Sequence, residues 1–325
     1  MAGWKSDKSG LGVAFGHHGE FVQGLFTSKE GKACRGLVTV PCNLFASKAH
    51  FRPRWGAPLR VEPSDKLKAR AAAELALQRM GAERLGGVIQ VSNNIPTGWG
   101  LGSSTSDIVA TVRAISGALG CVLAADRIGA IAVAAETASD STMFDREDLL
   151  FAQRGGYVIE KLSGSLPVLE VLGFNTGCSS SGIDTLRLPL PDYTDQEIQT
   201  FHRIMSELRR AVVEGDRKLV GLTATISAQI NDSYLPKPQF ALINSIAEKI
   251  GALGVQVAHS GTVMGMLFDP SDCDLVLKTA KAREMLSNLR IGPIWRFTTA
   301  RSNGDDVPID CLSKRADDDL SFYQV

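Results

Sequence analysis

The 325-residue chain predicts an α+β fold in two domains. Segments with the patterning of strands and segments with helical apolar spacing follow one another without the regular alternation of a doubly wound sheet. Apolar residues make up 44% of the chain and charged residues 22%, a composition that supports a substantial buried core. A run rich in Gly, Ser and Thr at 173–182 favours a boundary there, with an N-terminal domain over 1–172 and a C-terminal domain over 173–325.

Charge and composition exclude several classes of protein. Basic and acidic residues are equal in number at 35 each, so no overall charge favours nucleic acid or an anionic membrane as a partner. The first ten residues lack the apolar core of a signal peptide and no run of 18 apolar residues occurs, so we expect a cytoplasmic protein, either a monomer or a homodimer. The six cysteines show no C-x-x-C pair, and neither a disulfide framework nor a zinc site is predicted.

The spacing of apolar residues predicts seven helices. They span 65–82, 107–120, 124–138, 195–213, 214–232, 239–253 and 271–287. In the first of these helices the expected buried stripe consists of Leu67, Ala71, Leu75, Leu77 and Met80. The basic residues off that stripe, Lys66, Lys68, Arg70 and Arg79, are expected on a solvated face.

Runs of β-branched and apolar residues predict the strands. They lie at 36–41, 87–91, 155–159, 166–172 and 293–300, with a strand, a turn and a strand over 254–269. The pair at 155–159 and 166–172 is expected to form a hairpin, and 43–63, which contains three prolines, to form a hairpin at a sheet edge. The acidic segment at 317–319 belongs to a tail expected to be disordered at its end.

One stretch, 95–107, joins an apolar strand to a helix through a cluster of glycines and hydroxyl residues. Gly98, Gly100 and Gly102 permit positive φ and a close backbone approach, and a helix that opens at Ser103 leaves amide groups free at its positive end. Such a helix start binds anions, and the hydroxyls that follow can donate to phosphate or coordinate Mg²⁺. Ordinary helix capping is the alternative. The spacing fits neither the Walker motif nor the dinucleotide fingerprint.

The nine residues from Pro96 to Ser104 resemble the phosphate-loop motif of the GHMP kinase superfamily, to which galactokinase, homoserine kinase and mevalonate kinase belong. The resemblance implies an ATP-dependent small-molecule kinase with a ribosomal-protein-S5-domain-2-like N-terminal domain, a ferredoxin-like C-terminal domain and an active site between them. The residues it assigns to ATP are Pro96, Gly98, Gly100, Leu101, Gly102, Ser103, Ser104, Thr105 and Ser106.

A second glycine-rich segment, 13–24, is predicted to be a turn between two apolar strands that carries His17, His18, Glu20 and Gln23. A plain hairpin with solvated polar residues is the alternative. The form Gly-x-x-Gly-Glu-x-x-Gln-Gly is similar to the first motif of the L-threonine kinases of cobalamin biosynthesis, which implies that these four residues contact the phosphoacceptor. That subfamily has a small residue and a cysteine where His17 and His18 stand.

Glu136 ends a helix that is apolar on nearly all sides, and an unpaired buried carboxylate there needs a cation or strong donors. Mg²⁺ is one candidate, and a salt bridge to an arginine elsewhere is the other. In the superfamily a glutamate at this point shares Mg²⁺ with the loop serine, so the resemblance assigns Glu136 and Ser104 as metal ligands and Glu136 to the catalytic site.

The segment 139–145 resembles the part of the superfamily that carries either an aspartate base or only acceptor-binding groups. Asp140 is the first candidate for the base and Asp145 the second. Capping of a turn by Asp140 together with Ser139 is the alternative.

The turn within 254–269 resembles the third superfamily motif, with Ser260, Gly261 and Thr262 in place of Gly-x-Gly. The resemblance places these three residues near the phosphates and the acceptor. A plain glycine hairpin is the alternative, and His259 beside it is either an interior histidine or a ligand contact.

These motifs predict an ATP- and Mg²⁺-dependent phosphotransferase that acts on a small hydroxy amino acid. L-Threonine is the first expectation from the subfamily resemblance, and L-serine, homoserine or a related amino acid are the alternatives. A nucleotide-binding sensor that has lost turnover is a rival of another class. The ATP-dependent decarboxylase branch of the superfamily has no support beyond the common fold.

Overall fold

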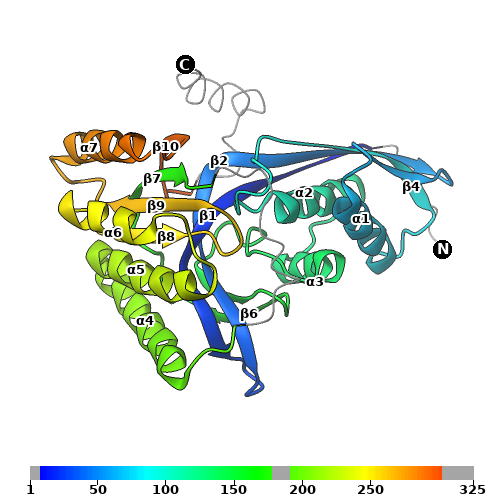
Figure 1. The fold of residues 1–325 in the computed structure, drawn as a ribbon. Helices are drawn as coiled ribbons and strands as arrows, with labels where there is room; N and C mark the ends of the chain where they lie inside the picture. The colour runs from blue at the N-terminus through cyan, green and yellow to red at the C-terminus, as the bar shows by residue number, and fades with distance from the viewer. Residues whose placement is uncertain (1–7, 178–190, 302–325) are drawn as a thin grey trace.

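The computed structural model describes residues 8–177 and 191–301, and the whole account below concerns these residues. They form an α+β structure in which one sheet runs through the molecule with strand order β10-β7-β9-β8-β1-β2-β4-β3, and β5 and β6 branch from β2 (Figure 1). Helices cover both halves of this sheet. No helix among the described residues combines the length and apolar composition needed to cross a bilayer.

The N-terminal half packs three helices against long antiparallel strands. Its elements are β1 (Gly10–Thr27), β2 (Ala33–Trp55), β3 (Leu59–Glu62), β4 (Leu85–Asn93), β5 (Leu149–Ala152), β6 (Tyr157–Lys161), α1 (Leu67–Arg79), α2 (Ser103–Ala118) and α3 (Ala125–Glu136). Helix α2 contacts β1 and β2 and buries Ile108 and Ile115 completely, because its apolar residues recur at helical spacing. Residues 43–55, expected in an edge hairpin, lie inside the sheet between β1 and β4.

The predicted turn within 13–24 is wrong, because β1 runs through it as one strand. Three register shifts against β2, between Phe15 and Val22, replace the turn, and Gly19 there has φ +76°. Glycines that indicate a turn in a sequence also serve β-bulges, where an extra residue bends and twists a strand without reversing it. The bulged part of β1 is where the two histidines and Glu20 lie.

The C-terminal half has the ferredoxin-like arrangement expected from the resemblance. Its elements are β7 (Glu170–Asn175), α4 (Asp195–Glu214), α5 (Arg217–Tyr234), α6 (Phe240–Lys249), β8 (Gly254–Val257), β9 (Val263–Phe268), α7 (Leu275–Asn288) and β10 (Ile294–Thr298). The fold is defined by the chain order β-α-β-β-α-β and by the antiparallel spatial order β10-β7-β9-β8. Three helices, α4 to α6, take the place of the first helix of the motif. A pairing of Glu20 with Val257 joins this sheet to β1.

Strand β7 corrects two expectations. It pairs with β9 and β10, whereas the hairpin of this region is β5 with β6, so the predicted pairing of 155–159 with 166–172 is wrong. Its last residues, 173–175, are strand where a loop was expected, and 178–190 lie outside the described residues, as does 317–319. The division into 1–172 and 173–325 stays a prediction; its boundary falls within β7.

All seven predicted helices are present, but α1 presents a different face from the one expected. Its buried residues are Ala69, Ala72, Ala73, Ala76 and Leu77, whereas Leu67 is 68% exposed. Small alanines let α1 lie close to α2 and α3 and fill that contact without large side chains. Lys66, in the turn before α1, consequently pairs with Asp107 at the start of α2, so the expected solvated face is wrong for Lys66. Lys68 is exposed as expected, although its ammonium group reaches Glu136.

Candidate active site

A cavity of about 750 Å³ opens at the start of α2. It is lined by many of the predicted residues, namely His17, Pro96, Gly98, Gly100, Leu101, Gly102, Ser103, Ser104, Thr105, Glu136, Asp140 and Ser260. It is also lined by residues to which the sequence assigned no such role or only an open one, among them Lys66, Lys68, Asp107, Gln153 and His259. The structure therefore brings the loop, both candidate carboxylates and one residue of the third motif to one volume.

The glycine loop has the backbone that an anion site requires. Gly98, Gly100 and Gly102 have φ of 81°, 83° and 76°, in the left-handed region that favours glycine. Gly102 is the N-cap of α2 and no side chain caps the helix there. The first amides of α2 are therefore open toward the cavity at the positive end of the helix dipole.

The four hydroxyl residues of the loop divide into different roles. Thr105 Oγ1 donates to Glu136 Oε1 at 2.6 Å, and Ser106 Oγ donates to the Phe15 carbonyl at 2.9 Å. Ser103 Oγ accepts a long bond from Asn93 at 3.4 Å, and Ser104 Oγ is buried without a hydrogen-bond partner. Ser106 therefore ties α2 to β1, whereas Ser104 is left available for a ligand.

Glu136 is buried beside this free hydroxyl. Burial raises the pKa of its carboxyl to about 7, against the opposing effect of the Thr105 hydroxyl. Its nearest cation is Lys68, with Nζ 3.6 Å from Oε2, and the Lys68 side chain is half exposed, so its charge is partly screened by water. Buried carboxylate and hydroxyl oxygens that lack full partners are ligands that Mg²⁺ accepts, so Glu136 and Ser104 fit the metal role expected of them.

The cavity also receives positive charge from the start of α1, which the sequence did not reveal. Lys66 Nζ lies 2.6 Å from Asp107 Oδ2, whose other oxygen accepts from Ser47 and Asn93. Lys66 and Lys68 precede the loop by about 30 residues, and nothing local in the sequence indicates that contact. The sequence does show two lysines at the start of α1, followed by several alanines, but this pattern alone does not indicate which residues the lysines contact.

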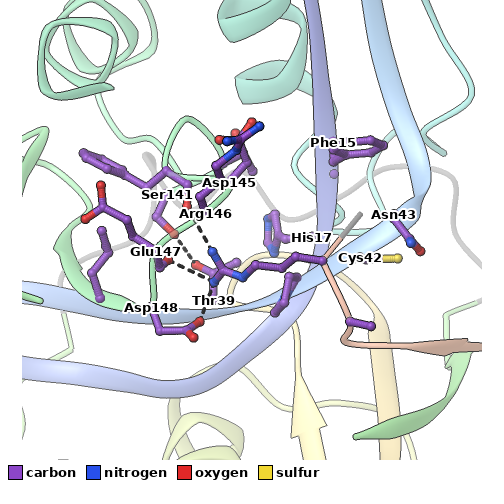
Figure 2. Close-up of a pocket in the computed structure, with 17 residues that line it drawn as sticks. Phe15, His17, Thr39, Cys42, Asn43, Ser141, Asp145, Arg146, Glu147 and Asp148 are labelled. Atoms are coloured by element: carbon purple, nitrogen blue, oxygen red, sulfur yellow. Dashed lines mark hydrogen bonds and ion pairs between the residues drawn. The ribbon is translucent and has the colours of Figure 1, made fainter. Parts of the chain in front are cut away.

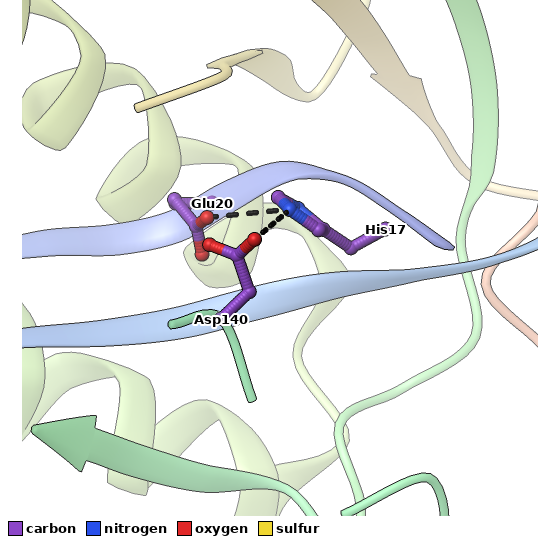
Figure 3. Close-up of side chains that lie close together, drawn as sticks. All are labelled: His17, Glu20 and Asp140. Atoms are coloured by element: carbon purple, nitrogen blue, oxygen red, sulfur yellow. Dashed lines mark ion pairs between the residues drawn. The ribbon is translucent and has the colours of Figure 1, made fainter. Parts of the chain in front are cut away.

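His17, Glu20 and Asp140 form a buried cluster at the other side of the cavity (Figure 3). His17 and Glu20 lie on β1, and Asp140 comes from the segment that follows α3. His17 Nε2 is 3.1 Å from Asp140 Oδ2, and His17 Nδ1 is 3.6 Å from Glu20 Oε1. The Gly19 amide nitrogen lies 3.2 Å from Nδ1, and Nε2 directs its proton at Asp140.

The cluster separates the proton affinities of its two carboxyls. Burial raises the pKa of Glu20 to about 8, and neither of its oxygens has a hydrogen-bond partner among the described residues. Burial would also raise the pKa of Asp140, but His17 outweighs burial and holds it below its ordinary value. Burial lowers the pKa of His17, yet the Asp140 carboxylate outweighs this and raises it to about 9. Asp140 is therefore the ionised carboxylate of the cluster at neutral pH.

His18 lies on the other face of β1 and does not line the cavity. Its ring packs 4.8 Å from Phe297 and 5.4 Å from Trp295, measured between ring centroids, and Nδ1 contacts the Gln256 amide. The bulge separates the two neighbouring histidines: His17 faces the cavity and His18 faces the C-terminal sheet. Substrate contact by His18 stays a prediction that its position does not favour.

Gln23 does not line the cavity directly but is joined to it through His259. Gln23 Oε1 lies 2.8 Å from His259 Nδ1 and accepts from Asn231 Nδ2 at 3.1 Å. Of the third motif, Ser260 lines the cavity, and Gly261 lies against the loop so closely that a Cβ there would be 1.8 Å from the Trp99 carbonyl oxygen. The Thr262 carbonyl accepts from Thr176 behind the loop.

A second cavity of about 110 Å³ lies beside the first and shares His17 with it (Figure 2). Thr39, Ser141, Asp145 and Asp148 are among its lining residues, and Ser141 Oγ donates to Thr39 Oγ1 at 3.0 Å. Asp145 faces this smaller cavity and is 3.0 Å from Arg113, so it does not reach the loop cavity as Asp140 does.

Known proteins resemble this chain in sequence and in fold. Residues 67–145 match the N-terminal domain of GHMP kinases. The chain is 26% identical over 267 residues to an L-threonine kinase of Salmonella typhimurium, covering 82% of this chain and 85% of the relative. It is 29% identical over 187 residues to an L-threonine kinase of Citrobacter freundii, covering 58% of this chain and 64% of the relative. A homoserine kinase structure from Cytophaga hutchinsonii, 16% identical, superposes with a TM-score of 0.69 over 93% of this chain and 98% of that one.

Residues 67–145 thus carry a GHMP kinase N-terminal domain, and the chain as a whole resembles GHMP kinases. The expected two-domain α+β fold of GHMP kinases is confirmed by the superposition and by the ferredoxin-like strand order. The glycine loop 96–104, which opens α2, falls within this matched domain, and the cavity lies where the N-terminal half meets the β8–β9 turn.

We expect His17→Gln to destabilise the protein by about 1–3 kcal/mol below pH 6.5, because the amide keeps a donor toward Asp140 but carries no charge. The pKa of His17 is about 9 in the folded protein, above its ordinary 6.5. Its stabilisation is then fully present below pH 6.5 and is lost as pH rises through 9. Melting temperatures measured from pH 5.5 to 9.5 should therefore converge for variant and parent at the alkaline end.

His202→Gln is the matched control, because His202 is exposed on α4. A melting-temperature difference for His17→Gln that stayed constant over this pH range would show that the ring is held by packing and not by its charge.

Proposed function

We propose that this protein is an ATP-dependent kinase that transfers the γ-phosphoryl group to the side-chain hydroxyl of a small hydroxy amino acid, with L-threonine as the first candidate. The observation that carries the proposal is the glycine loop, whose positive φ angles and uncapped helix start face a cavity that Asp140 also lines. The names of the two curated relatives support threonine as the acceptor.

In this mechanism the amides that open α2 and the hydroxyl of Ser103 hold the phosphates of ATP. Lys66 and Lys68 also line this cavity and add positive charge near the start of α2. Phosphoryl transfer needs little covalent help from a protein, so positioning and charge stabilisation account for most of the rate.

Ser104 and Glu136 would hold Mg²⁺, which neutralises charge on the β and γ phosphates when it is bound. The raised pKa of Glu136 fits this role, because a buried carboxyl without a full partner ionises when a cation arrives. The unpartnered Ser104 hydroxyl is the second group that a cation would satisfy.

Asp140 orients the acceptor hydroxyl and takes its proton as the phosphoryl group is transferred. Its low pKa keeps it ionised at neutral pH, and His17 fixes the carboxylate from behind. Glu20, Gln23 and Ser260 are the remaining predicted acceptor contacts that lie around this end of the cavity.

A nucleotide sensor without turnover remains the rival function, and a cytoplasmic location and a monomeric or dimeric state stay predictions. Release of ADP separates the two functions. We expect ADP release that depends on L-threonine, with O-phospho-L-threonine detected by ³¹P NMR, and weaker turnover with L-serine or homoserine. Tight ATP binding without acceptor-dependent ADP release, across the natural amino acids, would establish the sensor.

Asp140→Asn should lower kcat by about 10² to 10⁴, because the amide keeps the shape of the side chain but cannot take a proton. The KM for ATP should change little, since Asp140 does not lie on the loop. Asp126→Asn, on the exposed part of α3, is the control. Loss of turnover in Asp145→Asn with activity kept in Asp140→Asn would move the base to Asp145.

Glu136→Gln should raise the Mg²⁺ concentration needed for half-maximal rate by about 10- to 100-fold, the effect of losing one interaction with a charged group. The amide oxygen still accepts from Thr105, so the fold is retained. A Mg²⁺ titration of the steady-state rate measures the effect, with exposed Glu83→Gln as control. An unchanged Mg²⁺ requirement would assign Glu136 to its bonds with Thr105 and Lys68 alone.

A further inference from the structure

A lysine with no partner lies buried in the C-terminal half, and none of the three motifs contains it. Lys237 is 4% exposed, and its Nζ atom has no hydrogen-bond partner among the described residues. Its backbone is fixed between α5 and α6: the amide donates to Asp232 Oδ1 at 2.6 Å, and the carbonyl accepts from the Phe240 amide at 3.2 Å. The ammonium group is therefore held inside the protein by the chain around it.

This isolation is costly for the free protein. An ammonium group removed from water without a counter-charge loses several kcal/mol of solvation. Burial accordingly lowers the pKa of Lys237 to about 8, and Asp232 offsets this only in part. A buried cation of this kind is explained when a ligand provides the missing negative charge.

Lys237 does not line the cavity itself, but its neighbours connect it to His259 in the cavity wall. The charge of Lys237 acts on His259, which lines the cavity and bonds Gln23, and Gln23 in turn bonds Asn231 on α5. Burial, together with the nearby charges of Arg35, Lys237 and Arg154, lowers the pKa of His259 to about 3, against the opposing effect of Asp140. Positive charge thus gathers at this end of the cavity, around a neutral imidazole.

The unpartnered atoms here complement an amino acid zwitterion. Lys237 Nζ and Gln23 Nε2 are buried donors without acceptors, which suit a carboxylate. Glu20, beside Asp140, has two carboxyl oxygens that accept no hydrogen bond, with the His17 ring 3.6 Å from Oε1, and they suit an ammonium group. A small alcohol without these charges would leave all of these groups unsatisfied.

We propose that Lys237, with the side-chain amide of Gln23, binds the carboxylate of an α-amino-acid acceptor and so restricts this kinase to zwitterionic substrates. This inference rests on the proposed function and identifies the group that selects the acceptor class. Lys237 acts on substrate binding and takes no part in the transfer step itself.

The test compares two acceptors in the parent enzyme, in a variant of Lys237 without the charge and in a matched control variant. L-Threonine and 1-amino-2-propanol carry the same hydroxyl and ammonium groups, and only threonine has the carboxylate. Lys237→Met removes the charge and keeps the length of the side chain, and Lys218→Met, exposed on α5, is the matched control. Steady-state KM and kcat for each acceptor, the KM for ATP and the melting temperature of the free protein are measured.

We expect Lys237→Met to raise the KM for L-threonine about 10- to 100-fold, with the KM for ATP and the KM for 1-amino-2-propanol unchanged. Its melting temperature should equal or exceed that of the parent, because an apolar side chain replaces an unpaired buried charge. Lys237→Arg should recover part of the affinity for threonine.

Three results would overturn the inference. They are an unchanged KM for threonine, an equal loss with both acceptors, and a clear fall in melting temperature, which would give Lys237 a structural role. Each of these leaves the proposed function intact, since the parent enzyme still phosphorylates threonine. A parent enzyme that turns over no amino acid would instead remove the proposed function, and this inference with it.

Discussion

The active site depends on the close backbone approach of three chain segments. The glycine loop lies between β1 and the β8–β9 turn, held on one side by the His17 amide and the Leu101 carbonyl at 3.1 Å, and on the other by the Val263 amide and the Trp99 carbonyl at 3.3 Å. A Cβ at Gly102 would lie 2.5 Å from the His17 ring, and one at Gly100 would lie 2.7 Å from Gly261. Because glycine has no side chain, both halves of the protein can approach each other closely at the glycine loop.

The two acidic groups of the cavity illustrate how position sets chemical role. Glu136 faces a half-exposed lysine and has its pKa raised to about 7, whereas Asp140 faces a buried histidine and has its pKa lowered. Two carboxyls that share contact with Thr105 thus differ in proton affinity. Pairs whose proton affinities are separated in this way identify the acid and base assignments of a site. Here they favour Asp140 as the proton acceptor and Glu136 as a group that awaits a cation.

Local signals in the sequence were sufficient for the helices and for the loop. Apolar spacing places α2 and α5, and the alternating glycines at 98, 100 and 102 predict the positive φ angles that the structure shows. Contacts between distant segments were not predictable in this way. The pairing of β7, the approach of Lys68 to Glu136 and the burial of Lys237 depend on how elements far apart in sequence pack. The bulge in β1 was missed because glycine serves turns and bulges alike.

Strand β1 crosses from one half of the sheet to the other without interruption, pairing with β2 along its length and with β8 at Glu20. His17, which lines the cavity, and Glu20 and Gln23 are consequently carried on one length of backbone. Their separation is set by the spacing of about 3.4 Å per residue in a strand and by the register shifts between Phe15 and Val22. Inserting or deleting one residue between Phe15 and Gln23 would change this separation and also turn the following side chains to the opposite face. The shape of the cavity is therefore altered with less disruption by exchanging side chains on β1 than by changing the length of the strand.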